Sequence, residues 1–129
     1  MPFPLTHLCV AWHIIEKSGS KNAAQFILGS IAPDAVHHRE EFINGYNPSI
    51  GAEKKITHLC PISDERWGHV TDNEGWEERV KKFLREHANN AFAAGYAAHV
   101  LTDICNNKTL WYNFRTNFPQ EAVKGYTSE

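Results

Sequence analysis

The strongest candidate chemistry lies in residues 91–106, a stretch that is apolar almost throughout yet contains His99 and Asp103. Residues four apart lie on the same face of a helix, so this imidazole and this carboxylate are expected to be neighbours. A buried carboxylate is costly unless it is paired or bound to a metal. Two interpretations follow from this segment alone: a structural His–Asp pair, or two ligands of a metal site.

Three further polar residues lie in apolar surroundings and are candidates for the same site: His7, Asp34 and His58. His7 lies at the start of the first predicted helix, where the helix dipole disfavours a protonated imidazole. Each has a structural alternative. His7 could serve packing, Asp34 could be a turn residue bonded to its own backbone, and His58 could bond a backbone carbonyl.

Three histidines and two aspartates together offer imidazole nitrogens and carboxylate oxygens. Zinc accepts this donor set, and manganese or iron are possible substitutes. Two or more such ions about 3.5–4 Å apart would clamp the attacking and leaving oxygens of a phosphate ester. The residues therefore predict a metal site that hydrolyses phosphate esters, built from His7, Asp34, His58, His99 and Asp103.

Helical periodicity predicts the elements that position these residues. A first helix is expected from a Thr6 cap to about residue 18, with Gly19 as its end. A second ends near Pro33, which leaves Asp34 in a turn. Helices are also predicted over about 74–87 and 91–106. The latter is expected to be central and buried, with room for close neighbours at Gly95.

The remaining segments complete an all-α prediction. Residues 44–73 are expected to form a long irregular loop, packed and with short helical turns, and residues 110–114 a weaker helical or extended segment. No alternating strand is found. The expected fold is a compact multi-helix domain over 1–129. The cysteines and three tryptophans are predicted to be core residues: Cys9, Cys60, Cys105, Trp12, Trp76 and Trp111.

Bulk composition restricts the classes of function. The chain has 129 residues, 42% hydrophobic and 22% charged, with a net charge of −2, which gives no basic signature of nucleic-acid binding. No apolar run approaches the ~20 residues that cross a bilayer. The N-terminus lacks a signal-peptide pattern, so a cytoplasmic location is expected. The sequence gives no indication of oligomeric state.

Four stretches carry a resemblance to a known family: Thr6-His7, Gly-Ser-Ile-Ala-Pro-Asp at 29–34, Lys-Ile-Thr-His at 55–58 and Gly-Tyr-Ala-Ala-His-Val-Leu-Thr-Asp at 95–103. In this order they resemble the zinc-dependent phospholipase C family, which shares its helical fold with S1/P1-type nucleases. The last stretch is the most specific.

The resemblance implies one to three zinc ions. It places Asp34, His58, His99 and Asp103 around one zinc, and His7 with a bridging Asp103 at a further zinc. It also implies metal-bound hydroxide as the nucleophile and Asp34 as a catalytic residue that assists as base.

The chain also departs from the family pattern. Another zinc in the family needs two histidines and a glutamate after the central helix, but no histidine follows His99, and Glu121 and Glu129 are the only later glutamates. The first residue, Met1, lies six residues before His7, whereas secreted members use their mature N-terminal amine as a ligand. The chain ends where members usually continue, so we expect either a C-terminally shortened domain or an incomplete site.

Three hypotheses follow. The leading one is a zinc-dependent phosphoesterase of the phospholipase C type, acting on a phospholipid head group or a smaller phosphodiester. The second is a non-catalytic metal-binding helical domain that keeps the fold but lacks a complete catalytic site. The third, an HD-type phosphohydrolase, requires an adjacent His–Asp dipeptide, and none occurs in the chain.

Overall fold

Helices make up almost all of the described chain, which in this computed structural model comprises residues 4–38, 54–61 and 70–124. No strand occurs in these ranges, so the all-α prediction is confirmed for them. A helical turn covers 54–57. The elements are α1 (Pro4–Ser18), α2 (Ala23–Ile31), the 3₁₀ helix η1 (Ala32–His38), α5 (Asn73–Glu86), α6 (Ala91–Asn106), the π-helix η2 (Asn107–Trp111), α7 (Tyr112–Asn117) and α8 (Pro119–Lys124).

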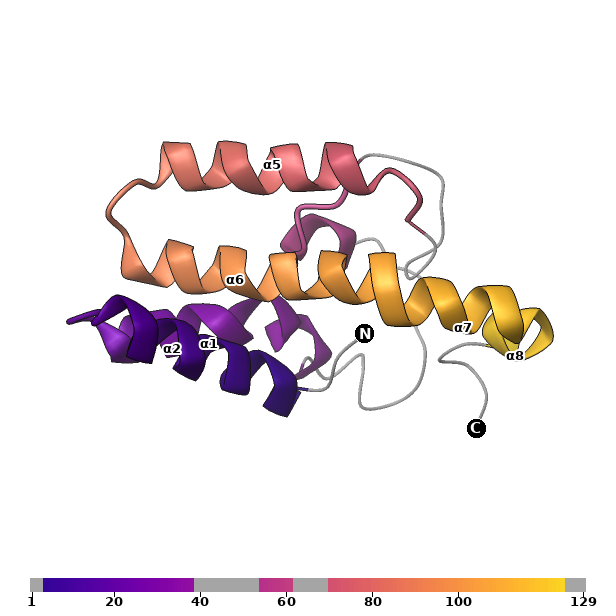
Figure 1. The fold of residues 1–129 in the computed structure, drawn as a ribbon. Helices are drawn as coiled ribbons and strands as arrows, with labels where there is room; N and C mark the ends of the chain where they lie inside the picture. The colour runs from indigo at the N-terminus through magenta and orange to yellow at the C-terminus, as the bar shows by residue number, and fades with distance from the viewer. Residues whose placement is uncertain (1–3, 39–53, 62–69, 125–129) are drawn as a thin grey trace.

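Helix α6 lies between α5 on one side and α1 and α2 on the other (Figure 1). Helices α7 and α8 continue the chain beyond the C-terminal end of α6. This arrangement confirms the prediction of a central helix. One flank of α6 nevertheless remains open, because Leu101 is 40% exposed and Cys105 is exposed. None of the described helices has the length and apolar character needed to cross a membrane.

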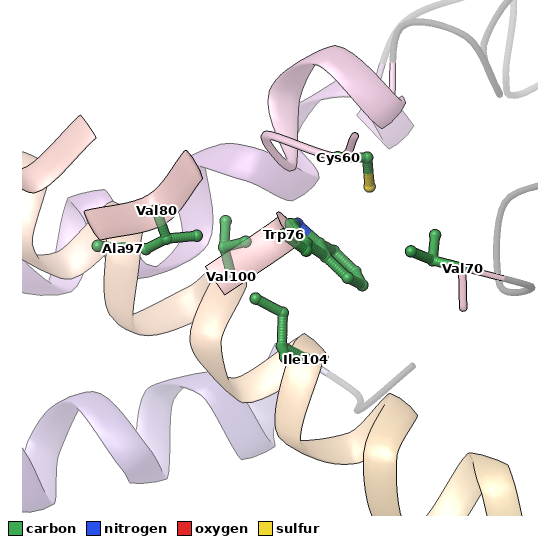
Figure 2. Close-up of a cluster of buried hydrophobic side chains, with 7 residues drawn as sticks. All are labelled: Cys60, Val70, Trp76, Val80, Ala97, Val100 and Ile104. Carbon is green, nitrogen blue, oxygen red and sulfur yellow. The ribbon is translucent and has the colours of Figure 1, made fainter. Parts of the chain in front are cut away.

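The hydrophobic core fills the space between α5 and α6. Figure 2 shows Trp76 and Val80 of α5 with Val100 and Ile104 of α6, together with Ala97, Cys60 and Val70. The indole Nε1 of Trp76 donates a hydrogen bond of 2.7 Å to the carbonyl oxygen of His58. The core therefore also holds the segment that carries a candidate ligand.

Helices α2 and α6 approach closely through two glycines. A Cβ on Gly29 would lie 2.0 Å from the carbonyl oxygen of Phe92, and a Cβ on Gly95 would lie 1.9 Å from that of Phe26. Both obstacles are backbone atoms, which cannot rotate away as a side chain can. The close approach that Gly95 predicted is therefore confirmed. It fixes the distance between α6, which carries His99, and α2, which leads directly into the η1 helix that carries Asp34.

Local capping explains the starts of α5 and α6 and the end of α1. The carboxylate of Asp72 accepts a 2.9 Å hydrogen bond from Gly75 N at the start of α5, and Asn90 accepts one of 3.1 Å from Ala93 N at the start of α6. Gly19 ends α1 with a φ of +64°, as predicted. The predicted Thr6 cap is wrong: α1 begins at Pro4, a residue suited to a first turn, so Thr6 lies inside the helix.

Other predictions about local structure need correction. Asp34 lies within η1 and not in an isolated turn, because the 3₁₀ helix continues directly from α2. Of the predicted 44–73 loop, 54–57 form a helical turn, while 44–53 and 62–69 lie outside the described residues. The segment after residue 106 is helical to residue 124, with a break at Phe118 between α7 and α8. Cys60 and Trp76 are buried as predicted, whereas Cys9 and Cys105 are exposed and Trp12 is 57% exposed. Trp111 is only partly buried.

Candidate metal centre

The five predicted site residues lie together at one place in the fold. His7 comes from α1, Asp34 from η1, His58 from the turn at 54–60, and His99 and Asp103 from α6. The Nε2 atom of His58 lies 3.3 Å from Asp34 Oδ1 and 3.3 Å from Asp103 Oδ2. His99 Nε2 lies 3.6 Å from Asp103 Oδ2, and His7 Nε2 lies 3.5 Å from Asp103 Oδ1.

The rings of His58 and His99 are oriented by backbone carbonyl groups. His58 Nδ1 lies 3.0 Å from the carbonyl oxygen of Lys54, and His99 Nδ1 lies 2.7 Å from that of Ser30. A carbonyl oxygen can only accept, so each neutral ring has its proton on Nδ1. Each Nε2 therefore has a lone pair, and the two Nε2 atoms face each other at 3.2 Å.

This arrangement fits a metal ion. Two facing lone pairs repel each other. The nearest carboxylate oxygens cannot relieve this repulsion when ionised, because they then have no proton to donate. A cation among these atoms would convert the repulsion into coordination, and hydrogen bonds from the far ring nitrogen to carbonyls are typical of metal-binding histidines. The predicted hydrogen bond from His58 to a backbone carbonyl is thus present. It is compatible with a ligand role because it uses Nδ1 and leaves Nε2 for a metal.

Asp103 lies between the histidines in a position that could bridge two ions. Both of its carboxylate oxygens are buried and accept no hydrogen bond from the described residues, and the same holds for His7 Nδ1. Oδ1 faces His7, and Oδ2 faces His58 and His99. Two groups of potential ligands have their donor atoms within 4.8 Å of one another: His7, His99 and Asp103, and Asp34, His58 and His99.

Burial sets the protonation states at this centre. It lowers the pKa of His7 to about 3 and that of His58 to about 4, so both rings are neutral near pH 7. Burial and the nearby charge of Asp34 raise the pKa of Asp103 to about 7. The imidazole nitrogens are therefore available to a metal, while Asp103 holds a proton in part of the metal-free molecules.

The comparison with protein families agrees with this geometry. A family model described as zinc dependent phospholipase C matches residues 5–106, most of the chain and all five site residues. The chain belongs to the zinc-dependent phospholipase C family. No curated protein and no solved structure matches the chain. The resemblance of the four sequence stretches to this family is thus confirmed.

Lys54 is a neighbour of this candidate metal centre that the sequence interpretation missed. It is 3% exposed, and its Nζ lies 3.3 Å from Asp34 Oδ1. Burial lowers the pKa of Lys54 from its usual value, and the charges of Asp34 and Asp103 oppose that effect. Lys54 and His58 are four residues apart in the sequence, which is the spacing of neighbours on one helical turn. That spacing was the signal that could have placed Lys54 beside the site.

The 54–60 turn that carries His58 is held by side chains of α5 and α6. Trp76 Nε1 donates to the carbonyl oxygen of His58, Arg79 Nε donates to that of Leu59 at 3.1 Å, and the Tyr96 hydroxyl donates to that of Thr57. Leu59 has a φ of +54°, a conformation that side-chain-bearing residues seldom adopt. These bonds compensate for that strain, so the packing of two helices positions His58.

Zinc binding is expected to release a proton from Asp103. Because the pKa of Asp103 is raised to about 7, most molecules carry this proton at pH 6, whereas His7 and His58 are already neutral. A metal must displace it, so zinc binding at pH 6 should release about one proton, and zinc affinity should fall about tenfold per pH unit between pH 7 and 5. Calorimetry in buffers of different ionisation enthalpy measures the proton count.

The control for this measurement is Asp103→Asn, which has no carboxyl proton to lose. At zinc concentrations that saturate the variant, proton release at pH 6 should be close to zero. If the unmodified protein binds zinc at pH 6 without releasing a proton, Asp103 is not a protonated ligand in the metal-free state.

Proposed function

We propose that this protein is a zinc-dependent hydrolase of phosphate esters. The observation that carries the proposal is the pair of facing Nε2 atoms of His58 and His99, with Asp34 beside them and the buried carboxylate of Asp103 accepting no hydrogen bond from the described residues. Membership in the zinc-dependent phospholipase C family supports both the metal and the class of substrate. The proposed zinc ligands are His7, Asp34, His58, His99 and Asp103.

The donor set suits one complete site and a second, less complete one. His58, His99, Asp34 and Asp103 would hold the first ion, and His7 with Asp103 would contribute to another. When bound, zinc supplies a Lewis acid that polarises the phosphoryl group and activates water. His99 is a member of both groups of potential ligands, but its Nε2 atom can bind only one ion. The second candidate function is therefore a site that holds a single ion and does not turn over substrate.

Asp34 is the proposed catalytic residue because it lies at the open side of the site. Its side chain is 19% exposed, whereas those of His58 and Asp103 are 0% and 3% exposed. Substrate and water would therefore reach the centre past Asp34. Its carboxylate can accept a proton from attacking water, as a general base does. A phospholipid or a smaller phosphodiester would both present the same phosphoryl chemistry to this group.

Metal analysis with a turnover assay tests the proposal. We expect purified protein to contain zinc and to hydrolyse bis(p-nitrophenyl) phosphate. Chelation should lower turnover by about 100-fold or more, and added zinc should restore it. Parallel assays with phosphatidylcholine vesicles then compare a lipid with a small phosphodiester. His7→Ala is compared with His13→Ala, since His13 is an exposed histidine on the same helix.

The outcomes separate the two candidate functions. Zinc with chelator-sensitive turnover supports the hydrolase. One tightly held zinc without turnover of either substrate supports the non-catalytic domain, and a protein that binds no metal contradicts both. Turnover that survives complete chelation would also rule out the proposed centre.

A further inference from the structure

Lys54 connects two of the proposed ligands through opposite ends of the same residue. Its side chain is only 4% exposed, and its Nζ lies 3.3 Å from Asp34 Oδ1. Its carbonyl oxygen lies 3.0 Å from His58 Nδ1 and also accepts the backbone N–H of His58 at 2.9 Å. The ammonium therefore acts on one ligand while the backbone orients another.

The ammonium balances charge in a place where the histidines cannot. His58 directs its Nδ1 at the Lys54 carbonyl oxygen, so its Nε2 lone pair, and not a proton, faces Asp34 and Asp103. Asp34 and Asp103 both lie within 3.3 Å of the same nitrogen, His58 Nε2, and so share one small volume. Two carboxylates at such a short separation disfavour each other's ionisation. A lysine that is itself buried and in contact with Asp34 offsets this repulsion before any metal arrives.

A bound zinc ion would take over that role and would be repelled by the same ammonium. Two cations that share a carboxylate lie a few ångströms apart, and their repulsion is weakly screened in a buried site. The contact that stabilises the metal-free centre therefore opposes metal binding. This opposition distinguishes Lys54 from a residue that only fills space in the core.

We propose that Lys54 is an internal counter-ion of the metal centre, which keeps the metal-free site folded and lowers its affinity for zinc. The inference rests on the zinc site of the proposed function. In this role Lys54 regulates the centre, because it makes the site less dependent on metal for its structure and makes the bound metal easier to exchange.

The test compares Lys54→Met, which keeps most of the volume and removes the charge, with Lys54→Arg, which keeps the charge. Zinc affinity is measured at pH 8 by competition with a chromophoric chelator, so that Asp103 is ionised. Lys54→Met is expected to bind zinc on the order of tenfold more tightly than the unmodified protein. Lys54→Arg should stay within about threefold of it.

Thermal unfolding with and without zinc provides a readout that packing alone would not change. Lys54→Met should lower the melting temperature of the metal-free protein more than that of the zinc-saturated protein, so zinc stabilises this variant more. If Lys54→Met folds only when zinc is present, this result also supports the inference, because zinc then stabilises the variant more than it stabilises the unmodified protein. A purely structural lysine would lower both melting temperatures equally and leave the zinc-induced shift unchanged.

Three results would overturn the inference: equal or weaker zinc binding by Lys54→Met, an unchanged zinc-induced shift, or a Lys54→Met chain that stays unfolded when zinc is added. The unmodified protein is the reference for the underlying site. If it binds no zinc, the proposed function fails. If it binds zinc and Lys54→Met does not bind more tightly, only the role of Lys54 fails.

Discussion

Replacing His99 with alanine is expected to remove zinc binding and phosphate-ester hydrolysis together. His99 is 1% exposed, its Nε2 lies 3.2 Å from His58 Nε2, and its ring stacks on His7 with centroids 3.6 Å apart. Losing a residue that only orients a ligand weakens metal binding about 10–100-fold, so losing a ligand common to both groups should cost more. Turnover should fall to the background rate.

The same variant should also be less stable in two separable ways. Without metal, His99→Ala leaves the carbonyl oxygen of Ser30 without its imidazole donor, which costs about 1–3 kcal/mol of unfolding free energy. With zinc a thousandfold above the Kd of the unmodified protein, a further ~4 kcal/mol of metal stabilisation is lost. Denaturant unfolding with and without zinc measures both quantities.

His13→Ala is the matched control because His13 is exposed on α1 and lies outside both ligand groups. It should keep the zinc content, turnover and stability of the unmodified protein. If His99→Ala retains its full zinc content, the ligand assignment is wrong, whatever happens to its stability.

The second large effect is expected from Gly95→Ala. The added Cβ would lie 1.9 Å from the carbonyl oxygen of Phe26 and 3.0 Å from Ser30 N, so α2 and α6 must move apart. Overpacking of this kind should lower the unfolding free energy by about 2–3 kcal/mol, although alanine alone favours a helix. Because α2 carries the Ser30 carbonyl that orients His99, zinc affinity should also fall, by about 10–100-fold.

Gly75→Ala is the control for Gly95→Ala. A Cβ on Gly75 would meet the carboxylate of Asp72, which is a flexible side chain and can rotate away. This variant should lose about 1 kcal/mol through the weakened cap and bind zinc normally. Normal zinc affinity in a destabilised Gly95→Ala protein would show that the spacing of α2 and α6 does not position His99.

Local chemistry in the sequence was sufficient to predict the helical class, the central helix and its His–Asp pair. Periodicity of apolar residues reports which side of a helix is buried, and His99 and Asp103 stood out because such a helix carries polar groups only for a reason. The resemblance of short motifs then selected Asp34 and His58, whose own neighbours left structural alternatives open. The all-α class and the family are confirmed, and the ligand roles remain predictions.

Tertiary structure alone decided which helix faces meet. Cys9, Cys105 and Trp12 were expected in the core, yet they lie on faces that no described element covers. Lys54, which sequence places in a polar stretch, is instead buried against Asp34. Exposure depends on contacts between segments far apart in the chain, which apolar periodicity within one segment does not contain.

The five candidate ligands owe their chemistry to the sequence and their relation to one another to the fold. The sequence determined the donor atoms: imidazole nitrogens and carboxylate oxygens. Only the packing decided that the Ser30 carbonyl, 69 positions away in the chain, orients His99. It also brings up the turn in which the Lys54 carbonyl orients His58, so that two Nε2 atoms face each other. The physical reason is that a histidine has two nitrogens, and its three-dimensional neighbours determine which one is left for a metal.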